Sequence, residues 1–464
     1  MVNYIHSMLN FKRFSTAQKI AVSFLLVILM GTVLLMLPIS HQDHQFYPFI
    51  DSLFTATSAT CVTGLVVDVT ANEFSIFGQA VIMLLIQIGG LGLMTLMAVF
   101  ILLLKSRLSM HEKIAMKEML NQEQVFNMHR FLMDILKYTL LFEGSGMLLL
   151  ALRFVPEYGF LSGGFKAMFI AVSAFCNAGF DILGSVSLMD YAHDPLVIFT
   201  IMALIVLGGL GFAVWFDLRD KLKLLLKKEL KLDRFRKSLS IHTRIVLAMT
   251  LLLIFMTAGI IFFLEWDNPG TLGPFAWWEK GMSSLFESVT LRTAGFASVD
   301  YGSLTLASKF LMIIIMFIGG SPGGTAGGIK TTTLAVLFIY IISNLRGRVH
   351  TVIFRRTISK DIIIRAMGIF FINLITLIIG IFLLCIIERH DFIELAFEAV
   401  SAMATVGLTL GITGSLTLGG KIIIILLMFI GRIGIMTLVL SLVSHHGKSS
   451  SNSVVYPNGS IIVG

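Results

Sequence analysis

A short stretch rich in serine and threonine, which ends in glycine and a bulky apolar residue, occurs four times in this chain and constrains its fold more than any other feature. The four copies read TSATCVTGL, SAFCNAGF, VTLRTAGF and SAMATVGL, and they close at Gly64, Gly179, Gly295 and Gly407. Successive closing glycines lie 115, 116 and 112 residues apart. A nearly constant period is typical of a repeat architecture. The sequence therefore predicts one structural unit that is present four times.

Apolar residues make up 56% of the 464 residues and charged residues only 13%, a balance that indicates an integral membrane protein. A shorter, half-polar segment with the glycine motif lies between the two apolar runs of each unit. We expect an all-α integral membrane fold of four M1–P–M2 repeats, in which eight transmembrane helices (M1 and M2) and four re-entrant pore loops (P) surround a pseudo-fourfold pore. Because a helix of about 20 apolar residues spans a bilayer, the expected spans are 17–37, 77–104, 132–155, 195–216, 244–264, 308–342, 365–387 and 418–443.

The expected boundaries of the units follow these apolar runs. Repeat 1 covers residues 17–104, repeat 2 residues 132–218, repeat 3 residues 244–343 and repeat 4 residues 365–443. Linkers at 105–131, 219–243 and 344–364 join the repeats, and segments 1–16 and 444–464 flank them. The first linker alternates charged and apolar residues at helical spacing, so we expect a helix there.

Lysine and arginine gather in the segments that join the repeats. Of 35 such residues, five lie at 105–133, ten at 219–244 and six at 345–365. Positive charge marks the cytoplasmic side, so we expect a multi-pass plasma-membrane protein with cytoplasmic linkers and termini, whose glycine motifs enter from outside. This topology accounts for most of the net charge of +8, and it disfavours nucleic-acid binding. The Lys-rich stretch 219–240 fits either anionic membrane lipid or a cytosolic partner, and both remain open.

The glycine motif suggests a way to bind a dehydrated cation. A half-helix that turns at glycine can return as extended chain, whose backbone carbonyl oxygens point inward. Four such strands around one axis form rings of carbonyl oxygens that can replace the hydration shell of a monovalent cation, and the negative ends of four half-helices face the same axis. The hydroxyls of Ser58, Ser173, Thr290 and Ser401 are placed to tie down the bends. The expected ion-binding residues are Val62, Thr63, Gly64, Asn177, Ala178, Gly179, Thr293, Ala294, Gly295, Thr405, Val406 and Gly407.

Two observations qualify this interpretation. Single glycines in membrane helices often serve close packing, and it is the even spacing of four copies between paired spans that favours pore loops. The third motif is also one residue shorter, since Thr290 stands five residues before its glycine whereas the other three hydroxyl residues stand six before theirs. The register of the third pore loop is therefore open.

A glycine-rich stretch, FIGGSPGGTAGGIKTTT at residues 317–333, interrupts the second span of repeat 3. Six glycines and a proline cannot continue a helix, and irregular backbone at membrane depth persists only where it is buried in protein or lines water. The corresponding stretches are GGLG, GGLG and GRIG, so that Arg432 replaces a glycine of the other repeats. We expect a flexible constriction that gates the pore, and a static helix break is the alternative. The expected gate residues are Gly319, Gly320, Gly323, Gly324, Gly327, Gly328, Lys330 and Arg432.

Other chemistries fit the sequence poorly. GGTAGGIKT nearly matches the phosphate loop GxxxxGK[ST], but Ile329 separates the last glycine from Lys330, and no strand can precede it inside an apolar span. Three sparse cysteines support neither a disulfide framework nor a zinc site. A cluster of nucleophiles that would suggest an enzyme is absent, so we expect no catalytic residue and no organic cofactor. A Na+- or H+-coupled secondary transporter of an organic solute is the alternative. Such a transporter needs a polar pocket at membrane depth, and the sequence places few polar groups there, Glu143 among them.

With these motifs the sequence resembles the superfamily of potassium transporters known as Trk/Ktr/HKT, and most closely the Ktr membrane subunit of the KtrB/KtrD type. The resemblance covers almost the whole chain. It rests on the four M1–P–M2 units, on glycine at every corner, on RTAGF at 292–296, on the intramembrane loop and on Arg432 in the last M2 span.

The resemblance implies K+ as the transported ion, because glycine at all four corners, Gly64 included, goes with potassium preference in this superfamily. It implies that the intramembrane loop is a gate with which Arg432 pairs. It further implies a homodimer in which each protomer has its own pore, and a cytosolic octameric ring of RCK-type regulatory subunits (KtrA/KtrC type) that bind ATP or ADP. Coupling to Na+ stays open.

Overall fold

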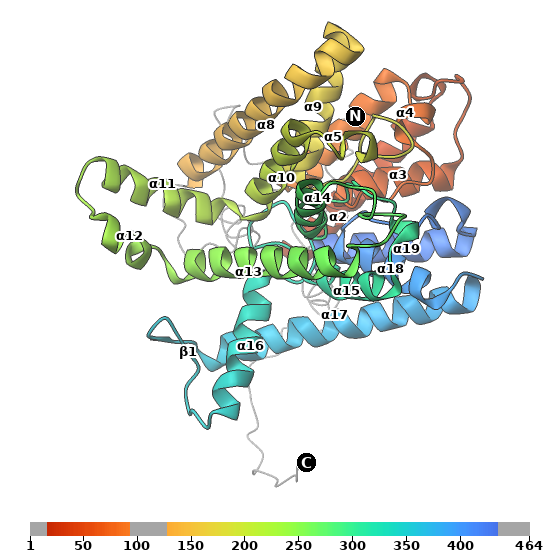
Figure 1. The fold of residues 1–464 in the computed structure, drawn as a ribbon. Coiled ribbons are helices and arrows are strands. Elements are labelled where there is room, and N and C mark those ends of the chain that lie inside the picture. Colours follow the sequence, from red (N-terminus) through yellow and green to blue (C-terminus); the bar gives the residue numbers. More distant parts are fainter. Residues whose placement is uncertain (1–15, 93–127, 435–464) are drawn as a thin grey trace, which may run out of the picture.

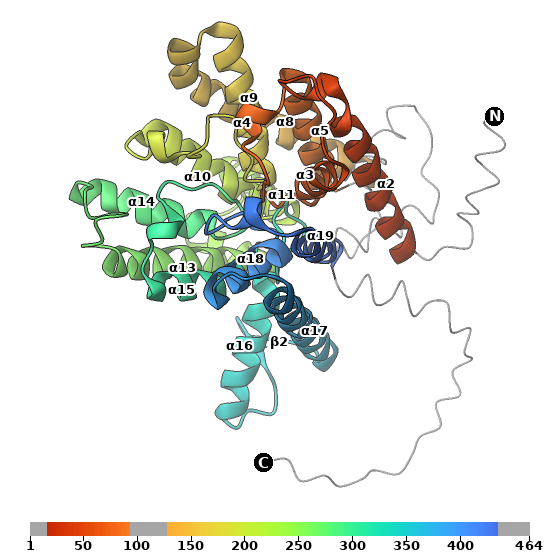
Figure 2. The ribbon, with the colours of Figure 1, turned by 90° about the vertical axis from the view of Figure 1, so that its right-hand side faces the viewer.

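The computed structural model describes residues 16–92 and 128–434, and within these ranges the regular secondary structure is almost entirely helical (Figure 1). Most of the helix expected at 105–131 and of the two flanking segments lies outside the described residues, as do the ends of the first and last predicted M2 spans. In each predicted repeat a long helix, a shorter helix and a third helix follow one another in the same order. Viewed along a perpendicular direction, the four groups of helices lie around a common centre (Figure 2).

The long, short and third helices of repeats 1 and 2 have closely similar arrangements. Repeat 1 contains α2 (Thr16–Met36), α3 (Phe49–Cys61) and α5 (Ile76–Leu91), with the short α4 (Thr70–Glu73) and a 3-10 turn at Pro38–Ser40 between them. Repeat 2 contains α8 (Met128–Tyr158), α9 (Phe160–Cys176) and α10 (Pro195–Gly209), with a 3-10 turn at Met189–Tyr191. The hairpin of α11 (Phe212–Leu226) and α12 (Leu232–Ser238) follows, and it extends beyond the first turn of α13 (Figure 1).

Repeats 3 and 4 complete the arrangement. Repeat 3 contains α13 (Ile241–Leu264), α14 (Trp277–Thr290), α15 (Leu306–Met316) and α16 (Thr331–Leu345), with a 3-10 turn at Tyr301–Ser303. Repeat 4 contains α17 (Lys360–Ile387), α18 (Phe392–Ala404) and α19 (Leu418–Ile433), with a 3-10 turn at Thr413–Ser415. One short antiparallel hairpin, β1 (Val352–Ile353) with β2 (Arg356–Thr357), lies in the linker between them, and the fold of the described residues is otherwise helical as expected.

The third helix of every repeat begins at a side chain that caps it. Ser75, Asp194, Thr305 and Thr417 each accept a hydrogen bond from a backbone N–H in the first turn of α5, α10, α15 and α19. Such caps satisfy backbone donors that a helix leaves unpaired and stabilise it by about 1 kcal/mol. The recurrence of the cap shows that the four repeats share their local structure as well as their order of helices.

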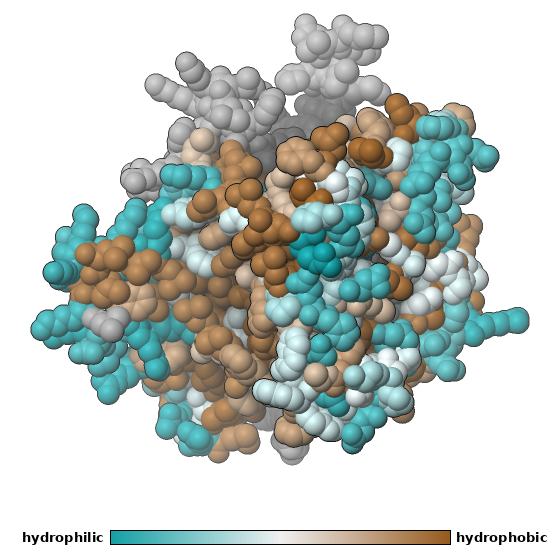
Figure 3. Space-filling model, turned by 45° about the horizontal axis from the view of Figure 1, so that its top comes forward, coloured by the Kyte–Doolittle hydropathy of each residue, from teal (hydrophilic) through white to brown (hydrophobic). Residues whose placement is uncertain are grey.

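Four helices in the described residues are long and apolar enough to cross a membrane: Gln18–Met36, Leu132–Tyr158, Ile241–Leu264 and Lys360–Ile387. They carry exposed apolar side chains, for example Val33, Phe263 and Phe382. Figure 3 shows a broad area of apolar side chains between polar side chains at the left and right edges of the molecule. Such a surface suits a lipid environment, and the chain is a multi-pass membrane protein. The count of eight spanning helices stays a prediction.

One predicted span is wrong in its extent. Residues 195–216 do not form a single helix, because α10 ends at Gly209 and α11 leaves at an angle of 98°. At the bend Gly211 has φ of 89°, and a Cβ atom there would lie 2.6 Å from the carbonyl oxygen of Pro322. The predicted interruption at 317–333 is confirmed, since α15 ends at Met316 and α16 begins at Thr331.

Candidate functional site

The four closing glycines meet in a closed ring at the centre of the molecule. A Cβ atom added to Gly64 would lie 2.5 Å from the carbonyl oxygen of Ala178, the residue before Gly179. In the same way, Gly179 faces the carbonyl of Ala294, Gly295 faces that of Val406, and Gly407 faces that of Thr63, each closer than 3.0 Å. The order 64, 179, 295, 407 and back to 64 closes on itself, so the repeats contribute equivalent backbone groups around one axis. Any side chain on these glycines would collide with the next repeat.

The backbone has the same unusual conformation at all four corners. The residue two positions before each glycine has positive φ: 58° at Val62, 59° at Asn177, 73° at Thr293 and 53° at Thr405. The glycines themselves have φ between 70° and 97°. Positive φ is costly for residues with a Cβ atom, above all for the β-branched Val62, Thr293 and Thr405. A strained conformation that recurs four times around one axis indicates a functional site.

Repeat 3 reaches the ring by a tighter helix end. In repeats 1, 2 and 4 the N–H of the residue before the glycine donates over 2.8 Å to the carbonyl of Ser58, Ser173 or Ser401, five positions earlier. In repeat 3 the N–H of Ala294 donates over 2.9 Å to the carbonyl of Thr290, four positions earlier. The missing residue is absorbed in this turn, and Gly295 takes the same place as the other glycines. The open register of the third motif is thereby explained.

The expected hydroxyl ties form in three repeats. The hydroxyls of Ser58 and Ser401 accept hydrogen bonds from the N–H of Gly64 over 3.1 Å and of Gly407 over 3.0 Å. The hydroxyl of Thr290 instead donates to the carbonyl of Phe296 over 2.7 Å. The buried hydroxyl of Ser173 has no hydrogen-bond partner among the described residues, so the expectation is wrong for this side chain.

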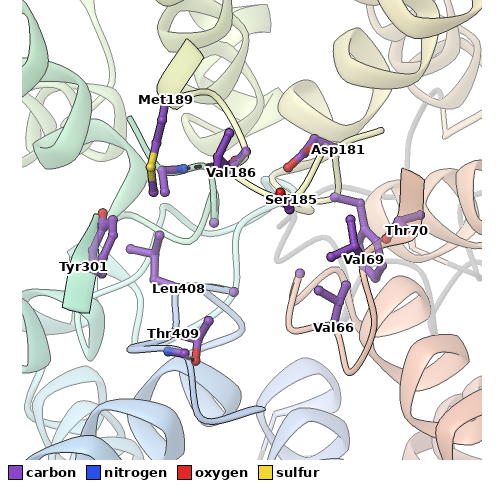
Figure 4. A pocket seen from close by; sticks show the side chains of 18 of the residues that line it. Val66, Val69, Thr70, Asp181, Ser185, Val186, Met189, Tyr301, Leu408 and Thr409 are labelled. Carbon is purple, nitrogen blue, oxygen red and sulfur yellow. Dashed lines mark hydrogen bonds between the residues drawn. The ribbon is translucent and has the colours of Figure 1, made fainter. Parts of the chain in front are cut away.

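A cavity of about 290 Å³ opens onto the ring and is lined by all four closing glycines. Figure 4 shows Asp181, Tyr301 and Thr409 on different sides of it. Asp181 and Asp300 give this vestibule two carboxylates. Burial raises the pKa of Asp181 above the usual value for aspartate. A concave surface with carboxylates at its wall attracts cations towards the ring.

The glycine-rich loop, residues 317–330, crosses the opposite side of the ring. Its backbone is bound to the α10–α11 bend, because Ser321 and Thr325 donate from N–H to the carbonyls of Gly209 and Gly208, and Phe212 donates to the carbonyl of Gly323. The Thr325 hydroxyl also donates to the carbonyl of Phe175 at the end of α9, over 3.0 Å. The loop is therefore attached to the C-terminal end of α9 and to the bend between α10 and α11.

Close packing explains several glycines of the loop. A Cβ atom on Gly319 would collide with the carbonyl of Gly327, and one on Gly320 with the side chain of Ala326. A Cβ atom on Gly327 would collide with the hydroxyl of Thr405, one of the ring residues. Gly323 and Gly328 have positive φ, of 73° and 64°. The loop thus fits directly beneath repeat 4 of the ring, with no room for side chains at these positions.

Two basic side chains hold the loop in place. Arg432 donates from Nη1 to the carbonyl of Thr325 over 2.6 Å, and from Nη2 to the carbonyls of Gly89 and Gly90 in α5. Lys330 donates to the carbonyl of Ala326 over 2.7 Å. Within the described part of the chain neither side chain forms an ion pair with a carboxylate. An arginine at membrane depth is costly without a polar partner, and here the partner is backbone carbonyl oxygen, including that of Thr325 in the loop.

The glycines of the GGLG, GGLG and GRIG stretches have a contact in common that the sequence did not reveal. A Cβ atom on Gly89, Gly208 or Gly431 would collide with a carbonyl oxygen near the end of the short helix of the same repeat, that of Thr60, Phe175 or Met403. These glycines let α5, α10 and α19 approach the C-terminal ends of α3, α9 and α18 closely. In repeat 3 the loop glycine Gly319 packs against Gly327 instead.

Other buried polar groups surround the site, and the sequence analysis did not single out all of them. Glu143 on α8 contacts the amide of Gln87 at 3.4 Å and the thiol of Cys176 at 3.8 Å. Thr325, Glu287 and Glu398 were missed. Carboxylates inside the half-polar pore helices were a usable signal for the last two, but Thr325 stands among glycines and nothing in its surroundings marks it.

Comparison with known proteins shows what the chain is similar to. The sequence profile of the family described as TrkH, cation transport protein, matches residues 6–453. Ktr system potassium uptake protein B of Bacillus subtilis is 42% identical over 452 residues, which is 97% of each chain. Potassium/sodium uptake protein NtpJ of Enterococcus hirae is 41% identical over 98% of each chain. The crystal structure of the potassium transporter TrkH from Vibrio parahaemolyticus has a TM-score of 0.68 at 19% identity, covers 90% of this chain and 84% of its own, and shows a shared fold.

Proposed function

The chain belongs to the TrkH family of cation transport proteins, and we propose that it takes K+ into the cell through the ring formed by its four closing glycines. Members of this family are transporters and not enzymes. The observation that carries the proposal is the cyclic contact of each glycine with the carbonyl before the next one. Backbone carbonyls that face a common axis can replace the water around a monovalent cation.

The ring offers no ionisable side chain of its own, and this favours selection by backbone oxygens. Val62, Thr63 and Gly64 of repeat 1 and their counterparts Asn177–Gly179, Thr293–Gly295 and Thr405–Gly407 are the proposed selectivity filter. Two of the relatives that match nearly the whole chain are named for potassium uptake, one of them also for sodium. Gly64 stands at the first corner, and glycine at all four corners supports a preference for K+.

The loop at 317–330 is the proposed gate. Thr325 bonds to the carbonyl of Phe175 at the end of α9, and Gly327 packs against Thr405 of the ring. Three backbone hydrogen bonds join the loop to the α10–α11 bend, and Arg432 joins it to repeat 4. Since these contacts join three repeats, displacement of the loop requires the M2 helices to move relative to one another. Lys330 and Arg432 add positive charge that opposes cation passage while the loop is in place.

Regulation by a separate cytosolic protein is proposed from the relatives. Three of them are named as potassium uptake proteins of a Ktr system. We propose that this chain is the membrane subunit of such a system in the plasma membrane, that it forms a homodimer with cytoplasmic termini, and that an octameric RCK-type ring which binds ATP or ADP acts on the gate. The basic hairpin α11–α12 continues directly from the α10 bend that holds the loop.

Complementation tests the proposal. A bacterial strain that lacks its own potassium-uptake systems should grow at limiting K+ when it expresses this chain together with a Ktr-type cytosolic subunit, and tracer uptake of rubidium should follow growth. Expression of either subunit alone separates the contribution of the membrane chain from its regulation. Absence of growth and uptake with both subunits, at verified membrane expression, would contradict the proposed function.

A further inference from the structure

Two carboxylates lie inside the pore helices of repeats 3 and 4, directly behind the ring. Glu287 on α14 is 1% exposed. One of its oxygens accepts hydrogen bonds from the Ser298 N–H over 3.0 Å and the Ser298 hydroxyl over 2.7 Å, and the other accepts from the Tyr301 hydroxyl. Ser298 and Tyr301 belong to the segment that leaves the ring after Gly295. Glu287 therefore fastens that segment to its own pore helix.

Glu398 on α18 makes the equivalent connection in repeat 4. It is fully buried, and its two oxygens accept hydrogen bonds from the Thr409 hydroxyl over 2.7 Å and the Thr413 hydroxyl over 2.5 Å. Thr409 in turn accepts from the N–H of Gly411 over 3.0 Å, which continues the tie along the same segment. We call such a connection between a buried carboxylate and the segment after the glycine a carboxylate brace. Because Thr409 stands two residues after Gly407, the brace of repeat 4 lies immediately next to the ring.

The two carboxylates occupy corresponding places. Glu398 stands nine residues before Gly407, and Glu287 eight before Gly295, and the difference is the residue that the tighter helix end of repeat 3 removes. Nine residues before Gly64 and Gly179 the chain has Thr55 and Ile170. A carboxylate brace is thus a property of repeats 3 and 4, and repeats 1 and 2 have none at this position.

The two braces also contact each other. The ring of Tyr301, which donates to Glu287, packs edge-on against Phe397, the residue before Glu398, with ring centroids 6.1 Å apart. Repeats 3 and 4 are neighbours in the glycine ring, where Gly295 faces the carbonyl of Val406. The segments of both repeats are therefore held as one unit on one half of the ring.

Burial of a carboxylate without compensation is expensive, and removal of one partner from a buried, hydrogen-bonded charge is strongly destabilising. Neither Glu287 nor Glu398 caps its helix, since both lie beyond the first turn of α14 or α18 and their oxygens accept hydrogen bonds from outside the helix. Their bonds go only to the chain that follows the glycines. What they fix is the position of that chain.

We infer that Glu287 and Glu398 are positioning residues that set the discrimination between alkali cations, an inference that rests on the proposed transport through the ring. Neither side chain reaches the ring itself. Each keeps its segment close to the pore helix and so determines how closely the carbonyls of Ala294, Gly295, Val406 and Gly407 approach a cation. Discrimination by a carbonyl ring depends on cavity size and on the number and field of its dipoles. If the carbonyls that repeats 3 and 4 contribute are held less tightly, they can close around Na+, which is smaller than K+.

The test uses the full-length chain with its cytosolic subunit and measures uptake of K+ and Na+ in competition. Glu287→Gln and Glu398→Gln keep the side-chain size but turn one acceptor oxygen into a donor. We expect the K+/Na+ ratio to fall by roughly fivefold to tenfold, as the loss of a charge-assisted hydrogen bond allows. Glu279→Gln is the matched control, since Glu279 lies on the same helix α14 but bonds to its own N-terminal turn and to His193. It should leave the ratio unchanged.

Milder variants keep the inference testable where a glutamine variant fails to fold. Tyr301→Phe and Thr413→Val each remove one donor and should lower the ratio by a smaller factor. Combined with Glu287→Gln, Tyr301→Phe should add little, because both act through one brace. A merely structural role would reduce K+ and Na+ flux together. An unchanged ratio in Tyr301→Phe and in Thr413→Val overturns the inference, whereas a wild-type chain without K+ uptake in the same assay overturns the proposed function.

Discussion

Arg432 donates a hydrogen bond from Nη1 to the backbone carbonyl of Thr325 over 2.6 Å, so that a side chain of repeat 4 holds the loop of repeat 3. Its Nη2 group reaches the carbonyls of Gly89 and Gly90 in repeat 1. Thr325 itself donates to the carbonyl of Phe175 in repeat 2. These two residues therefore connect all four repeats beneath the ring. A loop held in this way is stable only while the four repeats keep their relative positions.

Replacement of Arg432 by glutamine is predicted to raise basal cation flux. A hydrogen bond to a charged group contributes about 1.5–3 kcal/mol, and about 1.4 kcal/mol changes an equilibrium tenfold. If the loop is the gate, the open population should rise by about tenfold or more. The measurement is rubidium uptake into liposomes without the cytosolic subunit. Lys421→Gln is a suitable control, because Lys421 lies on the same helix but binds Asp51 and not the loop. Equal flux in wild type and Arg432→Gln would count against the gate.

Gly327→Ala is predicted to displace the loop by a steric route. The added methyl group would collide with the Thr405 hydroxyl and approach the carbonyl of Ala404, so the loop must move away from the ring. Basal flux should rise as it does for Arg432→Gln, without loss of a charge. Gly368→Ala on α17 is the control, because a Cβ atom there meets nothing within 4 Å. A lower flux in Gly327→Ala at equal membrane expression would show that the methyl group blocks the path and does not open it.

The sequence predicted the ring better than the parts around it. Four glycines at even spacing were sufficient to place equivalent corners, because the constraint at each corner is local: positive φ and no room for a Cβ atom. The residue missing from the third motif could not be placed in advance. Whether a helix ends with a bond to the fourth or the fifth preceding carbonyl depends on the neighbouring repeats that position Gly295.

Features that depend on contacts between distant parts of the chain could not be predicted from the sequence. Residues 195–216 form one apolar run, and the bend at Gly211 lies where the Pro322 carbonyl of the loop approaches the backbone of Gly211. Ser173 has the same spacing as Ser58, but its hydroxyl has no hydrogen-bond partner in the described part of the chain. Thr325 obtains its role from a carbonyl 150 residues earlier in the chain. In each case the local residues are ordinary, and tertiary packing decides the outcome.

Asp181 is predicted to make cation uptake sensitive to external pH. Its pKa is raised by burial, so acidification neutralises it at a higher pH than the usual value of about 3.9 for aspartate. The charged form, which attracts cations, is present above that pKa and is lost as pH falls through it. Uptake at limiting K+ should therefore decline as the medium is acidified. Asp181→Asn should lower uptake at neutral pH and flatten the pH profile. Asp190→Asn, at an exposed carboxylate outside the cavity wall, should retain the wild-type profile. An unaltered profile in Asp181→Asn would rule out this role.

Gly64→Ser is predicted to weaken discrimination between K+ and Na+. Gly64 has φ of 97°, and a Cβ atom there would lie 2.5 Å from the carbonyl of Ala178, which belongs to the next corner of the ring. The serine must push that carbonyl aside, and a residue with a Cβ atom at positive φ costs of the order of 1–3 kcal/mol by itself. Backbone strain alone is tested by Gly159→Ser, because Gly159 has φ of 83° but open space around its Cβ position. If displacement of the carbonyl matters, competition of Na+ with K+ uptake should increase in Gly64→Ser and not in Gly159→Ser. If both variants change selectivity equally, general destabilisation explains the effect and the ring does not select the ion.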